Sequence, residues 1–259
     1  MNMNNKNAYI AVFDSGVGGI SVLKRLMARM PRERYLYFGD SANAPYGDRP
    51  ESEILSLTLS AVEQIMTRPV KALVVACNTA TAVAVDTLRS RYPHLTVVGI
   101  EPAIKPAAEQ FPGGTVGILG TTATLESNRF HSLLSRHSHR CRFLPLAVPE
   151  LVPLVEQGLG NSAGARALLA RHLTPYREEL DALVLGCTHY PFAGEAIRAC
   201  LKPDTALFDG GIGTAAHTQR ILTDRGLLDP GPGALLWENS SPDPKLRALC
   251  QYLLTQPLL

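Results

Sequence analysis

Several features that would identify a membrane, secreted or nucleic-acid-binding protein are absent from the sequence. No apolar run approaches the roughly 20 residues that a membrane-spanning helix needs. The five cysteines are scattered without a Cys-x-x-Cys spacing, which argues against a disulfide framework and against a thiolate zinc site. The formal net charge is only +2, so we expect no broad basic face for nucleic acid. The expected partners are therefore small molecules or other proteins, with no membrane or nucleic acid.

The composition is ordinary for a globular protein, with 46% apolar and 19% charged residues among 259. This length allows one large domain or two moderate ones. The first seven residues are mostly polar, so we expect no signal peptide before the apolar segment that begins at Tyr9. Together with the scattered cysteines, this predicts a reduced, cytoplasmic protein.

Short apolar runs alternate with segments of helical periodicity along the whole chain. We expect strands at residues 9–13, 35–38, 73–76, 96–100, 115–119, 142–146, 183–186, 205–208 and 234–238. We expect helices at residues 20–30, 54–65, 80–91, 125–136, 151–157, 163–173, 193–201, 214–225 and from 244 onward. Strands that alternate with helices in this way predict right-handed βαβ units and an α/β fold with mostly parallel sheets.

The pattern repeats once along the chain. Asp14 and Gly120 end similar apolar segments 106 residues apart, and Cys77 and Cys187 end another pair 110 residues apart. Two offsets that agree this closely indicate two similar doubly wound domains related by pseudo-symmetry. We expect one domain to comprise residues 1–99 plus 209–259 and the other residues 100–208, with the active site in the cleft between them.

Cys77 and Cys187 each follow a buried strand, at the sheet edge where α/β proteins bind ligands. Residue types that commonly cap helices come next: Asn78 and Thr79 after the first cysteine, Thr188 and His189 after the second. A thiol at a helix N-terminus is biased toward thiolate, and the nearby N–H groups form a carboxylate site. We therefore expect two thiols that face each other across a shared cleft.

The remaining three cysteines (Cys141, Cys200 and Cys250) lie in apolar or helical patterns, and we interpret them as inert packing.

The first strand-to-helix turn contains Asp14, Ser15 and three glycines, which let the backbone approach a ligand. Its spacing is not G-x-G-x-x-G. Asp40 follows the second strand, so a nucleotide site stays an alternative, as does a plain capping loop. The turn at residues 120–124 repeats the first one with threonines. The polar loop at residues 39–50 has the length of a binding loop, although an ordinary surface connection is the default.

Two thiols on either side of a bound carbon suit the removal of a proton from one face and delivery of a proton to the other. A carbon acid beside a carboxylate is weakly acidic, so the site must hold it rigidly, supply oriented donors and exclude water. One cysteine must be thiolate while the other is thiol. Asp14 and His189 could assist by moving protons or by shaping the field at the thiols.

Six motifs resemble those of the glutamate racemases, within the group of cofactor-independent aspartate/glutamate racemases, and they cover about the first three-quarters of the chain. They are Phe-Asp-Ser-Gly-Val-Gly-Gly at 13–19, Phe-Gly-Asp-Ser-Ala-Asn-Ala-Pro-Tyr-Gly at 38–47, Ala-Cys-Asn-Thr-Ala at 76–80, Gly-Thr-Thr-Ala-Thr at 120–124, Val-Pro-Leu-Val-Glu at 152–156 and Gly-Cys-Thr-His-Tyr-Pro at 186–191. No single motif is specific, but all six in this order are.

The resemblance implies interconversion of L- and D-glutamate without pyridoxal phosphate or another cofactor, and without a metal. It implies that Cys77 serves the D-enantiomer and Cys187 the L-enantiomer, with Asp14, His189 and Glu156 assisting. The residues implied to contact substrate are Asp14, Ser15, Tyr46, Gly47, Asn78, Thr79, Thr121, Thr124, Thr188 and His189.

The resemblance also implies that the product supplies peptidoglycan synthesis. It leaves a homodimer and regulation by a cell-wall precursor open. The chain departs from the usual family pattern before Glu156, where it has Ala-Val-Pro-Glu at 147–150, and at 209–211, where it has Asp-Gly-Gly.

Three alternatives stay open on sequence grounds. A related racemase or isomerase acting on aspartate or another carbon acid would keep both thiols. A thiol hydrolase would need only one cysteine with its histidine. A non-catalytic two-lobed amino-acid binder would need neither thiol. Pyridoxal chemistry requires a lysine, and the six lysines all lie outside the motifs.

Overall fold

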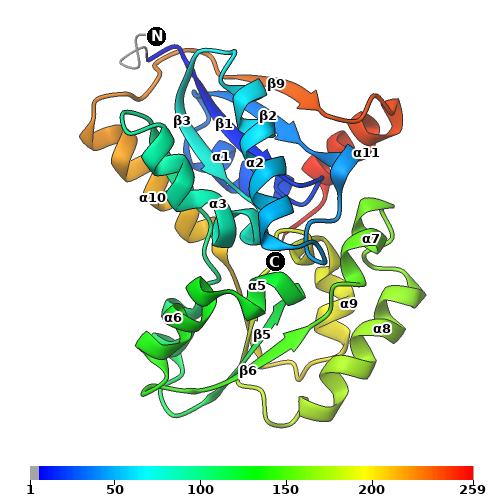
Figure 1. The fold of residues 1–259 in the computed structure, drawn as a ribbon. Coiled ribbons are helices and arrows are strands. Elements are labelled where there is room, and N and C mark those ends of the chain that lie inside the picture. The colour runs from blue at the N-terminus through cyan, green and yellow to red at the C-terminus, as the bar shows by residue number, and fades with distance from the viewer. Residues whose placement is uncertain (1–5, 259) are drawn as a thin grey trace.

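The computed structural model describes residues 6–258, and its strands form two separate parallel sheets (Figure 1). The first sheet contains β1 (Tyr9–Asp14), β2 (Arg34–Gly39), β3 (Val70–Val75), β4 (Thr96–Gly99) and β9 (Ala234–Asn239). The second contains β5 (Thr115–Gly120), β6 (Arg142–Ala147), β7 (Ala182–Leu185) and β8 (Ala206–Asp209). We call the parts of the chain around these sheets the first lobe and the second lobe.

The two sheets have the same strand order. The first runs β4-β3-β1-β2-β9, and the second, taken from β8, runs β8-β7-β5-β6. Strands β1 to β4 therefore correspond to β5 to β8 in turn, and every pair is parallel. This confirms the predicted α/β class and the duplication. It also makes the strands that precede the two cysteines, β3 and β7, equivalent.

Helices cover both faces of each sheet. The first lobe has α1 (Ile20–Arg29), α10 (Gly210–Asp224) and α11 (Pro244–Thr255) on one face, and α2 (Glu51–Ile65) and α3 (Asn78–Arg91) on the other. The second lobe has α4 (Ile104–Gln110) and α6 (Asn128–His137) on one face, and α7 (Leu151–Glu156), α8 (Ala163–Leu173) and α9 (Gly194–Ala199) on the other. The short helix α5 (Thr122–Glu126) follows β5 at the junction of the lobes.

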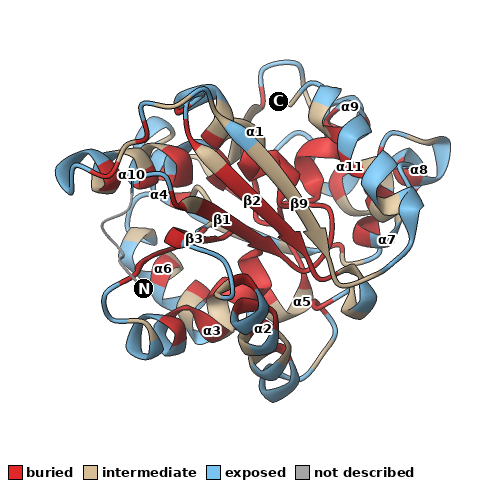
Figure 2. Ribbon diagram, turned by 90° about the horizontal axis from the view of Figure 1, so that it is seen from above, coloured by how far each residue is buried: buried red, intermediate tan, exposed pale blue. Residues whose placement is uncertain are grey.

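Side-chain alternation along β1 explains why both faces are covered. Ile10 and Val12 pack toward α1, whereas Ala11 and Phe13 pack toward α2 and α3. Because all four are fully buried, the strand is apolar throughout, as expected for a central parallel strand. Figure 2 shows this burial in β1, β2 and β3, while the edge strand β9 is only partly covered.

Three differences between the expected and the observed helices have a local cause or concern a whole element. A helix over 125–136 was expected, but α5 and α6 are separate because Ser127 lies between them in an extended conformation and accepts a hydrogen bond from the Phe130 N–H, which starts α6. Helix α10 begins at residue 210 rather than 214, since Asp209 caps it through the Gly211 N–H. Helix α4 was not expected at all.

The sheets are built from residues 9–99 with 234–239, and from residues 115–209. Helices α10 and α11 both pack on α1, so the C-terminal segment returns to the first lobe. The finer domain limits, 1–99 plus 209–259 and 100–208, stay a prediction. Within residues 6–258, no helix combines the length and apolar character that a membrane crossing needs.

Candidate active site

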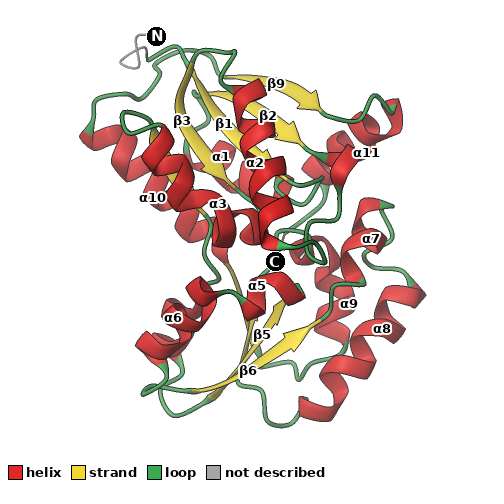
Figure 3. Cartoon of the chain, in the orientation of Figure 1, coloured by secondary structure: helices red, strands yellow, loops and turns green. Residues whose placement is uncertain are grey.

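Cys77 and Cys187 occupy equivalent positions in the two lobes. β3 ends at Val75 and β7 ends at Leu185, so each cysteine follows its strand by two residues. Figure 3 shows the arrowheads of β3 and β5 directed toward the junction of the lobes, where the carboxyl ends of both sheets lie. Both thiols are buried, and both line one cavity at this junction.

The cavity is small. Its volume is about 20 Å³, which is room for a single water molecule. An amino acid can therefore enter only if the lobes or the side chains around the cavity move apart. The lining residues are Ser15, Pro45, Tyr46, Gly47, Asp48, Cys77, Asn78, Thr79, Thr121, Pro149, Val152, Cys187, Thr188 and His189.

Cys77 is the N-cap residue of α3. Its sulfur accepts a hydrogen bond from the Ala80 N–H at 3.4 Å and lies 3.4 Å from Ser15 Oγ. Burial, with the charge of Asp14 adding to it, raises the pKa of Cys77 from 9.0 to about 11 against the smaller effects of Ser15 and Ala80. The expected bias toward thiolate is thus wrong for Cys77 in this closed state, because removal from water outweighs the helix N-terminus.

Cys187 has a different environment. His189 Nδ1 lies 3.6 Å from Cys187 Sγ, and His189 Nε2 lies 2.6 Å from Glu156 Oε1. Burial alone lowers the pKa of His189, but its contacts with Cys187 and Glu156 outweigh burial and raise that pKa well above 6.5. The three side chains form a row in which a proton on His189 has a thiol on one side and a carboxylate on the other.

The helix expected directly after Cys187 is not there. A 3-10 helix, η3 (Tyr190–Ala193), follows, and α9 starts only at Gly194. Pro191 within η3 has no N–H, so a regular helical ladder cannot begin at Thr188. The prediction of a helix N-terminus beside both thiols therefore holds only for Cys77.

Asp14 lies at the end of β1 and is fully buried. Its carboxylate accepts hydrogen bonds from the Gly16 N–H at 2.9 Å and from Thr188 Oγ1 at 3.0 Å. Burial raises the pKa of Asp14 above 3.8, although the charge of His189 and the Gly16 N–H act in the opposite direction. Asp14 therefore connects the first lobe to the residue that follows Cys187.

The polar lining contains one side chain without a partner. The Asn78 amide is buried, and neither its oxygen nor its nitrogen has a hydrogen bond among the described residues. A buried amide with nothing bound to it carries a desolvation cost that a polar ligand would remove. Nearby, Thr79 Oγ1 lies 3.0 Å from Thr121 Oγ1 and 3.2 Å from Thr124 Oγ1, across the lobe junction.

The loop after β2 reaches the cavity, as its length suggested. Tyr46 and Gly47 line it, and the Gly47 carbonyl accepts a hydrogen bond from the Ala123 N–H of the second lobe. The Tyr46 hydroxyl donates to Asp40 Oδ2 at 2.5 Å, and Asn43 also donates to Asp40. Asp40 thus holds the loop in place and does not itself line the cavity.

Most of the predicted site residues line the cavity, but three lie behind it. Asp14, Thr124 and Glu156 contact lining residues through Thr188, Thr79 and His189. Four lining residues were not predicted from the sequence: Pro45, Asp48, Pro149 and Val152. The first two belong to the loop singled out as a binding loop, and Val152 opens the motif that ends at Glu156. Membership of that loop or of that motif was therefore the sequence feature that could have identified these three residues.

Among residues 6–258, no three His, Cys, Asp or Glu side chains come together in a way that could hold a metal ion. The described residues that line the cavity include no lysine. The buried Lys71 is the second residue of β3, at the opposite edge of the sheet, where it pairs with Glu33 at 2.6 Å.

Comparison with known families and sequences gives a consistent result. The family described as Asp/Glu/Hydantoin racemase matches residues 20–219. A glutamate racemase of Clostridium botulinum is 38% identical over 255 residues, covering 97% of this chain and 99% of the relative.

Solved structures agree with the sequence comparison. A glutamate racemase from Thermus thermophilus, in complex with β-chloro-D-alanine, matches with a TM-score of 0.82 and 38% identity, covering 98% of this chain and 96% of that one. The Escherichia coli glutamate racemase, in complex with L-glutamate and the activator UDP-MurNAc-Ala, matches with a TM-score of 0.84 and 33% identity, covering 95% and 94%.

Proposed function

Because the chain belongs to the Asp/Glu/Hydantoin racemase family and is an amino-acid racemase of the glutamate racemase type, we propose that it moves the α-proton of glutamate between Cys77 and Cys187. One observation carries this proposal. Two buried thiols, each placed two residues after equivalent strands of the two lobes, line one cavity. A carbon bound between them would have one sulfur on each face.

The proton transfers balance without a cofactor. On the L side, the Cys187 thiolate removes the α-proton, so the C–H bond breaks and an S–H bond forms. Cys77, as the thiol, delivers its proton to the opposite face, which leaves Cys77 as thiolate and gives D-glutamate. In the reverse direction Cys77 is the base and Cys187 the acid.

Different neighbours support the two steps. His189, held by Glu156, lies within 3.6 Å of Cys187 and can exchange a proton with it. Burial and the Asp14 carboxylate favour the thiol form of Cys77. Conversion of the L-enantiomer leaves Cys77 as thiolate and Cys187 as thiol, so proton exchange between turnovers must restore Cys187 as the base before the next L-glutamate reacts.

We assign substrate contacts to the lining residues with polar groups. The unpartnered Asn78 amide and the hydroxyls of Ser15, Thr79, Thr121 and Thr188 offer donors and acceptors for the two carboxylates and the ammonium group. Tyr46 and Gly47 close the site from the loop after β2. Thr124 lies behind this lining, where its hydroxyl is hydrogen-bonded to those of Thr79 and Thr121.

The wider role follows the family. The D-glutamate would supply peptidoglycan synthesis in the cytoplasm, where free thiols persist, and all five cysteines are free and buried. A cell-wall precursor is a candidate regulator, because the Escherichia coli enzyme was crystallised with the activator UDP-MurNAc-Ala. Assembly as a homodimer stays a prediction from the sequence.

The test is exchange of the α-hydrogen in heavy water by the variants Cys77→Ser and Cys187→Ser, with each glutamate enantiomer. We expect racemisation to fall by more than about 100-fold in both variants. The remaining thiol should still exchange the α-hydrogen of its own enantiomer and return deuterium to the same face. Cys77→Ser should thus label L-glutamate, and Cys187→Ser should label D-glutamate.

The control variant is Cys200→Ala, which should racemise and exchange both enantiomers normally. Full racemisation by either serine variant would eliminate the two-thiol mechanism. Parallel reactions with aspartate compare the proposal with its nearest alternative, a related racemase that has the same two thiols and a different side-chain pocket.

A further inference from the structure

The segment from Asp14, the last residue of β1, to Ser21 in α1 contacts the second lobe through three hydrogen bonds. The Val17 N–H donates to Glu156 Oε1 at 2.8 Å, and Thr188 Oγ1 donates to Asp14 Oδ2 at 3.0 Å. The third bond comes from Ser21, whose hydroxyl lies 2.9 Å from the Thr188 carbonyl oxygen. Ser21 is buried in the first turn of α1 and does not line the cavity.

The local sequence explains why the Thr188 carbonyl needs a donor from the other lobe. The neighbouring carbonyls of Cys187 and His189 accept hydrogen bonds from the Tyr190 and Phe192 N–H groups within their own turn. The corresponding donor for Thr188 would be residue 191, which is a proline and has no N–H. A buried carbonyl without a donor is costly, so the bond from Ser21 stabilises this loop only while the lobes are together.

Ser21 also has a second acceptor. The same hydroxyl lies 2.9 Å from the carbonyl oxygen of Gly18, three residues earlier in its own turn. When the lobes separate, the Ser21 proton can stay with Gly18. The contact with Thr188 can therefore form and break without leaving a buried donor unpaired in the first lobe.

The glycines of this turn show how closely the two lobes fit. A methyl group at Gly16 would lie 2.0 Å from Glu156 Oε1, and one at Gly18 would lie 2.3 Å from His189 Nδ1. The backbone of the first lobe thus packs directly against the two side chains that support Cys187. The backbone conformation at Thr188 sets where the His189 imidazole lies relative to Cys187, because Thr188 joins the two residues in the chain.

We propose that Ser21 is a positioning residue that fixes the Cys187 side of the site when the lobes close, an inference that rests on the proposed function. Its hydroxyl donates a hydrogen bond to the Thr188 carbonyl, and Thr188 lies between Cys187 and His189 in the chain. Ser21 acts on the proton transfer at Cys187 and has no direct contact with Cys77.

The test is Ser21→Ala, a change that favours the helix in which it lies. Loss of one hydrogen bond made in the closed state should lower kcat/KM by about 3- to 10-fold. The factor must be equal in both directions, because the enantiomers have equal free energy in solution. The informative readout is the isotope effect on kcat/KM with α-deuterated substrate.

We expect the isotope effect to rise for the enantiomer served by Cys187, which the exchange experiment with Cys77→Ser identifies. It should fall for the other enantiomer, since the step at Cys187 becomes more rate-limiting in both directions. Thr218→Val is the matched control, because Thr218 is fully buried and its hydroxyl donates to Thr214 within α10. That variant should leave both isotope effects unchanged.

Unchanged kcat/KM in Ser21→Ala, or a loss of rate with both isotope effects unaltered, would overturn the assignment of Ser21. Neither result would contradict the two-thiol mechanism, which is tested separately by the Cys77→Ser and Cys187→Ser variants.

Discussion

The two cysteines have the same position in their lobes but different support. Cys77 caps a 14-residue α-helix and has a hydroxyl and a backbone N–H near its sulfur. Cys187 precedes a short 3-10 helix and has an imidazole that is held by a carboxylate. The duplicated α/β units thus place two sulfurs at matching sheet edges. The residues after each strand give each sulfur different hydrogen-bond partners.

This difference suits a racemase. A two-base reaction needs one thiol and one thiolate at the start of each turnover, and two identical environments would not distinguish them. At Cys77, burial and Asp14 raise the pKa to about 11, while His189 at Cys187 has a raised pKa and can hold a positive charge.

The largest effect is expected from His189→Asn. Removal of the imidazole between Cys187 and Glu156 should lower racemisation by about 100- to 1000-fold, because general acid–base support at that thiol is lost. Exchange of the α-hydrogen of D-glutamate by Cys77 should change much less. Both rates are measured by NMR in heavy water.

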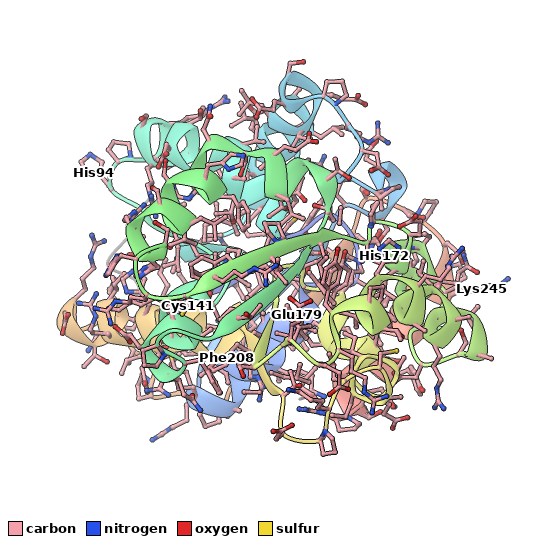
Figure 4. The ribbon with its side chains drawn as sticks, turned by 90° about the horizontal axis from the view of Figure 1, so that it is seen from below. His94, Cys141, His172, Glu179, Phe208 and Lys245 are labelled. Carbon is pink, nitrogen blue, oxygen red and sulfur yellow. The ribbon has the colours of Figure 1, made fainter. Side chains whose placement is uncertain are left out.

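His94→Asn serves as the control, since His94 is exposed at the edge of the molecule (Figure 4). An equal loss of exchange with both enantiomers would show that the two sides are not independently supported.

Asp14→Asn should have an intermediate effect on activity and the opposite effect on stability. Without the Asp14 charge the pKa of Cys77 falls, and a neutral amide holds the Thr188 hydroxyl less firmly than the carboxylate does, so kcat should drop about 10-fold. The variant should be more stable than wild type by about 1 kcal/mol at neutral pH, because a buried carboxylate is removed.

The pH dependence checks the sign of this effect. Burial raises the pKa of Asp14 in the folded state, so the unfolded chain releases this proton first as the pH rises from about 3.8. The wild type therefore loses stability as the pH rises from about 3.8 to the higher pKa that Asp14 has in the folded state, and the variant does not. A stability difference that persists well below pH 3.8 would contradict this cause.

Ser15→Ala should have a smaller effect, limited to the Cys77 side. The Ser15 hydroxyl near the sulfur lowers the pKa of Cys77, so its removal should raise that pKa and slow alkylation of Cys77 by iodoacetamide. We expect kcat to fall about threefold, within the range for a single hydrogen bond. Mass spectrometry of the alkylated peptides gives the alkylation rates of Cys77 and Cys187, and the Cys187 rate is the internal control.

Cys200→Ala and Cys141→Ala should have the smallest effect, below about twofold on kcat. Cys141 (Figure 4) immediately precedes β6, and Cys200 lies between α9 and β8, so both are at the strand-start edge of the second sheet, away from the cavity. Loss of a buried sulfur should lower the free energy of unfolding by about 1 kcal/mol. A large fall in activity would show that the thiol chemistry extends beyond the two lining cysteines.

Much of the fold was predictable because it follows from local patterns. Apolar runs such as residues 73–76 marked the buried strands, and the spacing of Cys77 and Cys187 revealed the duplication. Helix α4 was missed because its seven residues show little periodicity. The break at Ser127 was missed because apolar periodicity continues across it, and only the backbone conformation of that serine interrupts the helix.

The sequence by itself determined which residues meet at the carboxyl edge of each sheet, because strand position and turn residues are local properties. The tertiary structure alone decided how the lobes fit together. The contact from Val17 to Glu156 joins residues 139 apart in the chain, and that from Ser21 to Thr188 joins residues 167 apart. Such contacts depend on the relative placement of two packed lobes, which no local pattern of residues encodes.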